Sequence, residues 1–214
     1  PGALSVIAIA EKNNLFHAPE TYMEKISTKV NEKGVVDLDY STKENIFNLC
    51  EYLNKKPQSI TACIMDRPRH KDIIDELNIL GVKIKLITDG DVSGALLVTD
   101  DKYGVDIFLG IGGGPEGVLA SAALDTFECS FQGRFLFHTE EDKRRANKMG
   151  ITNLSKKYEL DEIVKGDSIF CATGITSGDL VSGIITENNK FITETLVTHK
   201  STGLKKIIKK VVNR

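Results

Sequence analysis

A single side chain in the glycine-rich segment Gly110–Gly117 can take part in chemistry, and it is the carboxylate of Glu116. Pro115 suits the first position of a helix, where its missing N–H costs nothing, so Glu116 is expected in the first helical turn. There the exposed backbone N–H groups and the positive end of the helix dipole stabilise a charged carboxylate. A glycine loop that presents one fixed carboxylate predicts a ligand for a hard metal ion, Mn²⁺ or Mg²⁺.

Two further polar pairs each follow a predicted strand, and each pair is separated by one residue. They are Arg67 and Arg69 around Pro68, and Asp89 and Asp91 around Gly90. The proline keeps its loop extended, so both guanidinium groups can reach one side and bind a phosphate. The two aspartates can accept hydrogen bonds from neighbouring hydroxyl groups or help to hold a cation. Together with the metal ligand, these groups predict a phosphorylated sugar or polyol as the ligand.

The glycine loop also matches other patterns. Gly112, Gly114 and Gly117 satisfy the dinucleotide fingerprint G-x-G-x-x-G. However, Glu116 would direct a negative charge at the pyrophosphate, and no acidic residue follows a second strand about 20 residues later. A P-loop does not fit, because no Lys-Ser/Thr pair follows the glycines. On the loop alone, a structural turn with an incidental glutamate stays open, as do salt-bridging arginines and an Asp-Gly-Asp turn.

Three strand–loop–helix units are predicted to position these groups. The strands cover residues 60–65, 82–87 and 105–109, and the helices that follow them cover residues 72–80, 92–98 and 118–124. Alternating strands and helices indicate a parallel sheet with right-handed crossovers. The carboxyl ends of parallel strands share one edge, where α/β proteins bind their ligands. The arginine pair, the aspartate pair and Glu116 are therefore expected to meet at this edge.

The other segments complete an α/β fold with an antiparallel C-terminal part. The continuously apolar residues 3–10 predict a strand covered on both faces. Residues 20–26 form a short segment of mixed character, and Ser41–Glu44 is a capping box for a helix that ends before Pro57. The remaining predicted elements are strands at 131–137, 167–172, 181–186, 191–199 and 204–212, and a charged helix at 140–149 capped by Thr139.

The composition is that of an ordinary soluble chain. The 214 residues are 41% hydrophobic and 27% charged, enough for one large domain or two small ones with cores of their own. A net charge of −2 argues against nucleic acid as a partner. No apolar run approaches the roughly 18 residues of a membrane span. Four dispersed cysteines indicate neither a disulfide framework nor a zinc site. With no signal peptide in view, a cytoplasmic location is expected.

Several of these motifs resemble, in order, those of the class II fructose-1,6-bisphosphatases, which belong to the inositol-monophosphatase-like sugar phosphatases. The matching segments are Ala18–Lys25, Asp66–His70, Asp89–Asp91, Gly110–Gly117, Gln132–Arg134 and Ala172–Thr176. The resemblance implies a layered α-β-α-β-α fold, in which a mostly parallel βαβ sheet precedes a mixed or antiparallel C-terminal part. It spans residues 1–214, with a substrate and metal edge in 1–130 and a C-terminal α/β portion in 131–214.

The resemblance also implies roles for individual residues. It places the bisphosphate sugar against Tyr22, Arg67, Pro68, Arg69, Asp89, Gly90, Asp91 and Gly113, and a Mn²⁺ or Mg²⁺ ion at Glu116. Arg67 stands where the family commonly has lysine. The activity implied is hydrolysis of fructose 1,6-bisphosphate, in gluconeogenesis, with sedoheptulose 1,7-bisphosphate as a second substrate. A homo-oligomer, either a dimer or a tetramer, is the implied assembly.

The chain departs from the family pattern at its start. It opens on Pro1, whereas the family's other acidic metal ligands and the loop at the scissile phosphate lie in a preceding segment. The catalytic residues are therefore expected outside this chain, and residues 1–214 alone are expected to be inactive, because one glutamate cannot hold a metal cluster. A non-catalytic sugar-phosphate sensor is the alternative function, and a nucleotide-binding module is a more distant one.

Overall fold

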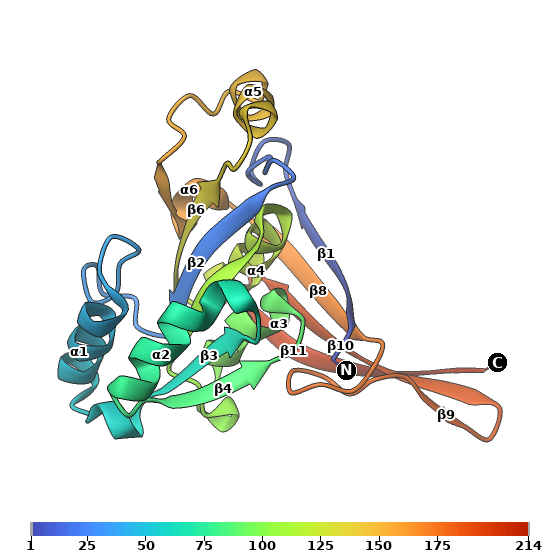
Figure 1. Cartoon of the computed structure of the whole chain (residues 1–214). Helices are drawn as coiled ribbons and strands as arrows, with labels where there is room; N and C mark the ends of the chain where they lie inside the picture. Colours follow the sequence, from blue (N-terminus) through green and yellow to red (C-terminus); the bar gives the residue numbers. More distant parts are fainter. Residues whose placement is uncertain (1, 214) are drawn as a thin grey trace.

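The computed structural model describes residues 2–213, which form two sheets with helices beside and between them (Figure 1). The six-stranded sheet has the order β4-β3-β5-β2-β6-β7. Its strands are β2 (Tyr22–Thr28), β3 (Thr61–Met65), β4 (Lys83–Ile87), β5 (Ile107–Gly113), β6 (Ser130–Leu136) and β7 (Lys157–Glu159). The five-stranded sheet runs β1-β8-β10-β11, with β9 paired to β10. Its strands are β1 (Leu4–Ala10), β8 (Ser168–Gly174), β9 (Ile185–Glu187), β10 (Lys190–His199) and β11 (Leu204–Asn213).

The helices are α1 (Thr42–Leu53), α2 (Lys71–Ile79), α3 (Asp91–Leu96), α4 (Gly114–Thr126), α5 (Glu140–Lys148) and α6 (Leu160–Ile163). Helices cover both faces of the six-stranded sheet, and α5 stands apart from them (Figure 1). Ile46 and Leu49 of α1 and Leu77 of α2 pack with Ile26 and Ile107 on one face of the sheet. On the other face, α3 and α4 lie between the two sheets (Figure 1). The described residues thus follow the order helices, sheet, helices, sheet, which agrees with a layered α/β fold.

Parallel pairing is confined to one half of the six-stranded sheet. β3 runs parallel to β4 and β5, whereas β2 runs antiparallel to β5 and β6, and β6 antiparallel to β7. The sheet is therefore mixed, and the expectation of a mostly parallel sheet holds only for β4-β3-β5. The reason is that β2 precedes the βαβ units in the chain and inserts between β5 and β6 in the opposite direction.

The central strand β2 occupies the segment for which the sequence predicted no definite element. Glu24 and Lys25 interrupt the apolar run that a strand buried on both faces normally has. Nevertheless Met23, Lys25 and Ile26 are all buried, because β2 lies between two other strands and is covered on each face. Long-range partners, which local pattern cannot reveal, stabilise this strand.

The chain passes between the two sheets more than once. β1 pairs antiparallel with β8, so the first strand of the chain belongs with the C-terminal strands. β6 and β7 follow residue 130 and complete the six-stranded sheet. A boundary at residue 130 consequently does not separate one sheet from the other.

Strand β1 is covered on one face only, which corrects the expectation of a strand covered on both. Leu4, Val6 and Ala8 pack against the core between the sheets. Ile7 and Ile9 point the other way and are 52% and 53% exposed. The apolar run predicted the strand correctly but not its position, because β1 is an edge strand of the five-stranded sheet.

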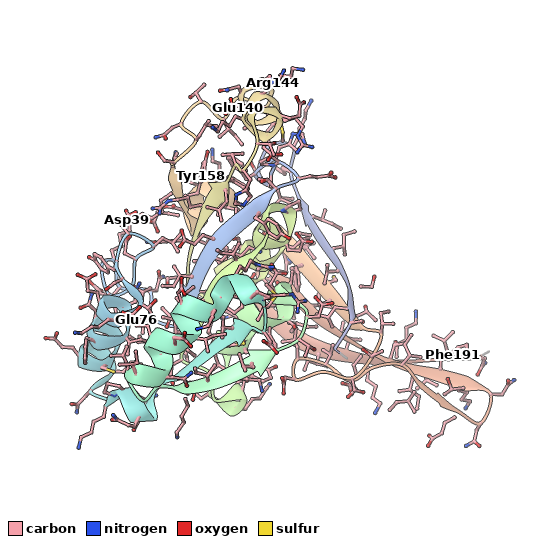
Figure 2. The ribbon with its side chains drawn as sticks, in the orientation of Figure 1. Asp39, Glu76, Glu140, Arg144, Tyr158 and Phe191 are labelled. Carbon is pink, nitrogen blue, oxygen red and sulfur yellow. The ribbon has the colours of Figure 1, made fainter. Side chains whose placement is uncertain are left out.

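The antiparallel C-terminal strands are confirmed. β10 and β11 pair along their full length, from Lys190 opposite Asn213 to His199 opposite Leu204. They form a ribbon that extends beyond the body of the molecule, and Figure 2 places Phe191 near its far end. The strand expected at 181–186 is shorter and begins at Ile185. None of the helices in residues 2–213 combines the length and apolar character that crossing a bilayer requires.

Candidate functional site

The three parallel strands bring the predicted polar groups to one edge of the six-stranded sheet. Arg67 and Arg69 follow β3, Asp89 follows β4, and Glu116 follows β5 in the first turn of α4, as expected. Tyr22 reaches the same edge from the opposite direction. It begins the antiparallel strand β2 and pairs with Gly113, the last residue of β5. The edge therefore gathers residues from four strands.

Two cavities meet at Glu116. One, of about 640 Å³, is lined by Tyr22, Gly113, Glu116 and His138, among others. The other, of about 370 Å³, is lined by Asp89, Gly90, Asp91, Ser93 and again Glu116. Because Glu116 lines both, one ligand that fills the two cavities would place this carboxylate near its middle.

Arg69 is held rigidly at this edge. Its Nε and Nη2 atoms donate to the carbonyl oxygen of Ile111, at 3.0 and 2.8 Å. Its guanidinium also lies over the ring of Tyr22, 4.9 Å from the ring centroid. One edge and one face of the planar group are thus occupied, and the Nη1 edge is left for an anion. This arrangement is suited to a phosphate group, which an arginine fork can bind through two hydrogen bonds.

Arg67 is placed differently from Arg69. Its Nη1 atom donates to the carbonyl oxygen of Asp66 at 3.0 Å, and its Nη2 atom lies 3.8 Å from Asp89 Oδ1. The pair with Asp89 is weak, because the Asp89 side chain is 85% exposed. Arg67 therefore links the segment that follows β3 to Asp89, which follows β4. Its positive charge stays available to a ligand.

His70 fixes the position of residues 66–70, which follow β3. It is fully buried. Its Nδ1 atom lies 2.7 Å from the carbonyl oxygen of Met65, to which it donates, and its Nε2 atom accepts from the backbone N–H of Ile111 at 2.8 Å. Both contacts use the neutral imidazole. Burial lowers the pKa of His70, and the nearby arginine charges add to that effect.

Asp91 is buried at this edge and forms an ion pair inside the protein. Only 8% of its surface is exposed, and its Oδ2 atom accepts a hydrogen bond from the ammonium group of Lys25. Lys25 is itself 2% exposed and lies on β2. Burial lowers the pKa of Lys25, and the charge of Asp91 opposes this effect. Sequence reasoning missed Lys25, because a buried lysine has no local signature and its partner is 66 residues away.

The three fingerprint glycines all face protein atoms. A Cβ at Gly112 would overlap Asp91 Oδ2 and lie 3.2 Å from Lys25 Nζ. A Cβ at Gly114 would lie 2.9 Å from the ring of Phe135, and one at Gly117 would overlap Met23 Sδ. Side chains are therefore excluded from these positions by internal packing. The pattern needs no dinucleotide to explain it.

Glu116 is the residue of this edge that suits a hard metal ion. Its carboxylate extends beside Gly113, where a Cβ would overlap Glu116 Oε2. An oxygen ligand at the junction of two cavities fits Mn²⁺ or Mg²⁺, which bind carboxylates. Within residues 2–213, no group of three or more His, Cys, Asp or Glu side chains is arranged to hold a metal.

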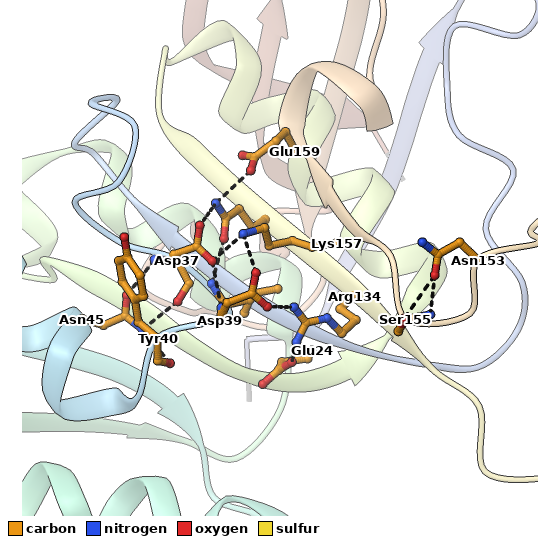
Figure 3. A network of polar contacts seen from close by, with 12 residues as sticks. Glu24, Asp37, Asp39, Tyr40, Asn45, Arg134, Asn153, Ser155, Lys157 and Glu159 are labelled. Atoms are coloured by element: carbon orange, nitrogen blue, oxygen red, sulfur yellow. Dashed lines mark hydrogen bonds and ion pairs between the residues drawn. The ribbon is translucent and has the colours of Figure 1, made fainter.

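The segment Gln132–Arg134 lies in a separate polar network (Figure 3). Arg134 pairs with Asp39 and lies 3.5 Å from Glu24, while Lys157 Nζ lies 2.9 Å from the second oxygen of Asp39. Hydrogen bonds from Lys157 and Arg134 hold the pKa of Asp39 below its usual value. Burial raises the pKa of Glu24, and Arg134 opposes this. The network ties the loop before α1 to β6 and β7, so Arg134 is structurally engaged.

Two neighbouring glycines should respond differently to alanine. Gly112→Ala forces the buried Lys25–Asp91 pair apart, and we expect the free energy of unfolding to fall by about 3 kcal/mol. Gly113→Ala meets only the flexible end of Glu116, so we expect a loss below about 1 kcal/mol. Urea unfolding of both variants measures the difference. Equal stability would contradict the packing described for Gly112.

Stability should depend on pH through His70. The folded protein keeps the imidazole neutral, whereas in the unfolded chain it binds a proton near pH 6.5. Stability from this group is complete above about pH 6.5 and is lost as the pH falls below that value. We expect His70→Gln to flatten the decline in unfolding free energy between pH 7.5 and about 5.5. The same change at the exposed His17 is the control. An unchanged slope in His70→Gln would contradict the prediction.

The chain is similar in sequence to known proteins. The family model described as "Bacterial fructose-1,6-bisphosphatase, glpX-encoded" matches residues 1–212. A D-fructose 1,6-bisphosphatase class 2/sedoheptulose 1,7-bisphosphatase of Synechococcus sp. (strain JA-3-3Ab) is 38% identical over 209 residues, covering 92% of this chain and 60% of the relative. A fructose-1,6-bisphosphatase class 2 of Haemophilus influenzae is 36% identical over 220 residues, covering 96% and 66%. The chain thus spans about three fifths to two thirds of these relatives. It belongs to the glpX-encoded, class 2 family of bacterial fructose-1,6-bisphosphatases.

Proposed function

We propose that this chain carries the sugar-binding half of a fructose-1,6-bisphosphatase. The observation that supports it most is the junction of two cavities at Glu116. Tyr22, on which the guanidinium of Arg69 stacks, lines one cavity, and the carboxylates of Asp89 and Asp91 line the other. Relatives in the family bear the names of fructose 1,6- and sedoheptulose 1,7-bisphosphatases. The reaction proposed is hydrolysis of fructose 1,6-bisphosphate to fructose 6-phosphate and phosphate, with sedoheptulose 1,7-bisphosphate as a second substrate.

Each group of the edge has a role in this proposal. Arg69, stacked on Tyr22, binds the distal phosphate, and Arg67 adds a second positive charge near it. Asp89 and Asp91, on either side of Gly90, accept hydrogen bonds from the sugar hydroxyls. The backbone at Gly113 and the carboxylate of Glu116 lie at the scissile phosphate. This assignment follows the charges of the side chains, because the arginines would bind the distal phosphate and the aspartates would accept hydrogen bonds from hydroxyl groups.

The metal ion would be bound at Glu116. Mn²⁺ or Mg²⁺ supplies activation of water and neutralisation of the charge that develops on the phosphate. One carboxylate is too few to hold the clustered ions that such hydrolysis uses. We therefore propose that residues 1–214 bind the sugar phosphate but do not hydrolyse it unaided. We further propose cytoplasmic action as a homo-oligomer, a dimer or a tetramer.

The second candidate function is a sugar-phosphate sensor without catalysis. The observation that favours it is that, within residues 2–213, no three His, Cys, Asp or Glu side chains are grouped so that they could hold a metal ion. Both candidates share the binding edge and differ only in turnover. Hydrolysis by the product of the complete gene separates them.

Binding should depend on Arg69 more than on Arg67. We expect Arg69→Lys to weaken the affinity of the chain for fructose 6-phosphate about tenfold, because lysine cannot hold Ile111 and a phosphate at once. Arg67→Lys, the matched control, keeps the positive charge and loses one hydrogen bond to the neighbouring Asp66 carbonyl, and we expect a change of at most about threefold. Isothermal titration calorimetry measures both. Equal losses would contradict the different roles proposed for the two arginines.

Phosphate release tests the function itself. With fructose 1,6-bisphosphate and Mn²⁺, we expect release by the product of the complete gene and a loss of about three orders of magnitude in its Glu116→Ala variant. Residues 1–214 alone should release none. Hydrolysis by residues 1–214 would refute their proposed dependence on further ligands. Binding without hydrolysis by the complete product would establish the sensor.

A further inference from the structure

Lys25 lies directly beneath the proposed sugar-binding edge without reaching it. Its side chain is 1% exposed, and its ammonium group donates to Asp91 Oδ2. β2 directs Met23, Lys25 and Ser27 toward α3 and α4, as the contacts of Met23 in the core between the sheets and of Ser27 with the Ala95 carbonyl show. Lys25 therefore approaches Asp91 from the protein interior, opposite to the cavity that Asp91 lines.

The two oxygens of Asp91 are consequently unequal. Oδ2 is engaged by Lys25, whereas Asp91 also lines the cavity of about 370 Å³ together with Asp89, Ser93 and Glu116. Oδ1 has no hydrogen bond to any of the residues that the structure describes and is not among their buried, unsatisfied atoms. It is the oxygen available to a hydroxyl donor in that cavity. A carboxylate held on one side and free on the other can accept a hydrogen bond in only a narrow range of directions.

The glycine loop is shaped around this pair. A Cβ at Gly112 would overlap Asp91 Oδ2, and a Cβ at Gly117 would lie 3.2 Å from Lys25 Cε. Two glycines of the motif therefore make room for an internal ion pair. The same glycine motif, in which β5 passes directly into α4, carries Glu116 in the first helical turn, so the motif, the lysine and the aspartate form one packed unit.

We propose that Lys25 is a positioning residue for sugar recognition, which orients the carboxylate of Asp91 so that Oδ1 accepts a hydrogen bond from a ligand hydroxyl. This inference rests on the proposed function, because it concerns the hydroxyl-binding part of the same site. Lys25 does not touch the ligand. Its effect is on ligands with hydroxyl groups and not on the phosphate, which the proposed function assigns to Arg69. The guanidinium of Arg69 is held by separate contacts, with the Tyr22 ring and the Ile111 carbonyl.

Two ligands separate this role from a general effect on folding. Fructose 6-phosphate offers hydroxyls and a phosphate, and inorganic phosphate offers no sugar hydroxyls. For Lys25→Met in the full 214-residue chain, we expect calorimetry to show at least a tenfold weaker affinity for fructose 6-phosphate. The affinity for inorganic phosphate should change by less than twofold. Lys29→Met is the matched control, because Lys29 follows the same strand but its side chain is 55% exposed. We expect it to bind both ligands as the unaltered chain does.

A second variant guards against misfolding. Lys25→Met leaves the charge of Asp91 buried and unpaired, which can unfold the protein. The double variant Lys25→Met/Asp91→Asn removes both charges, and circular dichroism verifies its fold. It should show the same selective loss for fructose 6-phosphate, because no cation orients the amide.

The outcomes distinguish the positioning role from the proposed function. If the unaltered chain binds fructose 6-phosphate and either folded variant binds it equally well, the positioning role is overturned and the function stands. A folded variant that loses affinity for both ligands to the same degree also overturns it. If the unaltered chain binds neither ligand, the proposed function is overturned, and the role of Lys25 with it.

Discussion

The ion pair between Lys25 and Asp91 joins three elements that are distant in the sequence. Lys25 comes from the middle of β2, Asp91 begins α3, and the end of β5 with the first turn of α4 closes over both. Removing an isolated charge from water costs several kcal/mol, so neither side chain can be buried without the other. The pair also fixes the register of β2. A slip by one residue would turn Lys25 to the opposite face and bring Ile26 beneath the glycine loop.

The backbone of Ile111 is a second point on which the site depends. β3 pairs with β5 only from Ala62 opposite Ile107 to Cys63 opposite Phe108, so β5 extends beyond the pairing. At Ile111 the N–H donates to His70 and the carbonyl accepts from Arg69. Side chains from the loop after β3 thus replace the hydrogen bonds that a longer strand would have made. The segment that follows β3 is therefore held in place by the part of β5 that extends beyond its pairing with β3.

The parts of the fold that sequence could predict are those with local causes. The strands β3, β4 and β5, the helices behind them and the capping boxes at Ser41 and Thr139 follow from periodicity and from neighbouring residues. The meeting of the arginine pair, the aspartates and Glu116 followed from parallel pairing alone. Strand β2 could not be predicted in this way, because its charged residues are matched by partners elsewhere in the chain. The same limit applies to the burial of Asp91 and to His70, whose roles depend on contacts across more than 40 residues.

The free edge of β11 has a consequence for how copies of this protein can meet. Two copies could pair their β11 strands antiparallel about a two-fold axis perpendicular to the sheet, and this axis keeps each side chain on the same face. Only registers that place odd-numbered residues opposite odd-numbered ones, and even opposite even, then match the alternation of side chains along a strand. The strand contains Lys205, Lys206, Lys209 and Lys210. Any such register that pairs more than half of the strand sets at least one lysine opposite a lysine, and like charges in that position repel. The opposed lysines of the ribbon therefore disfavour continuous sheets that run from one copy to the next.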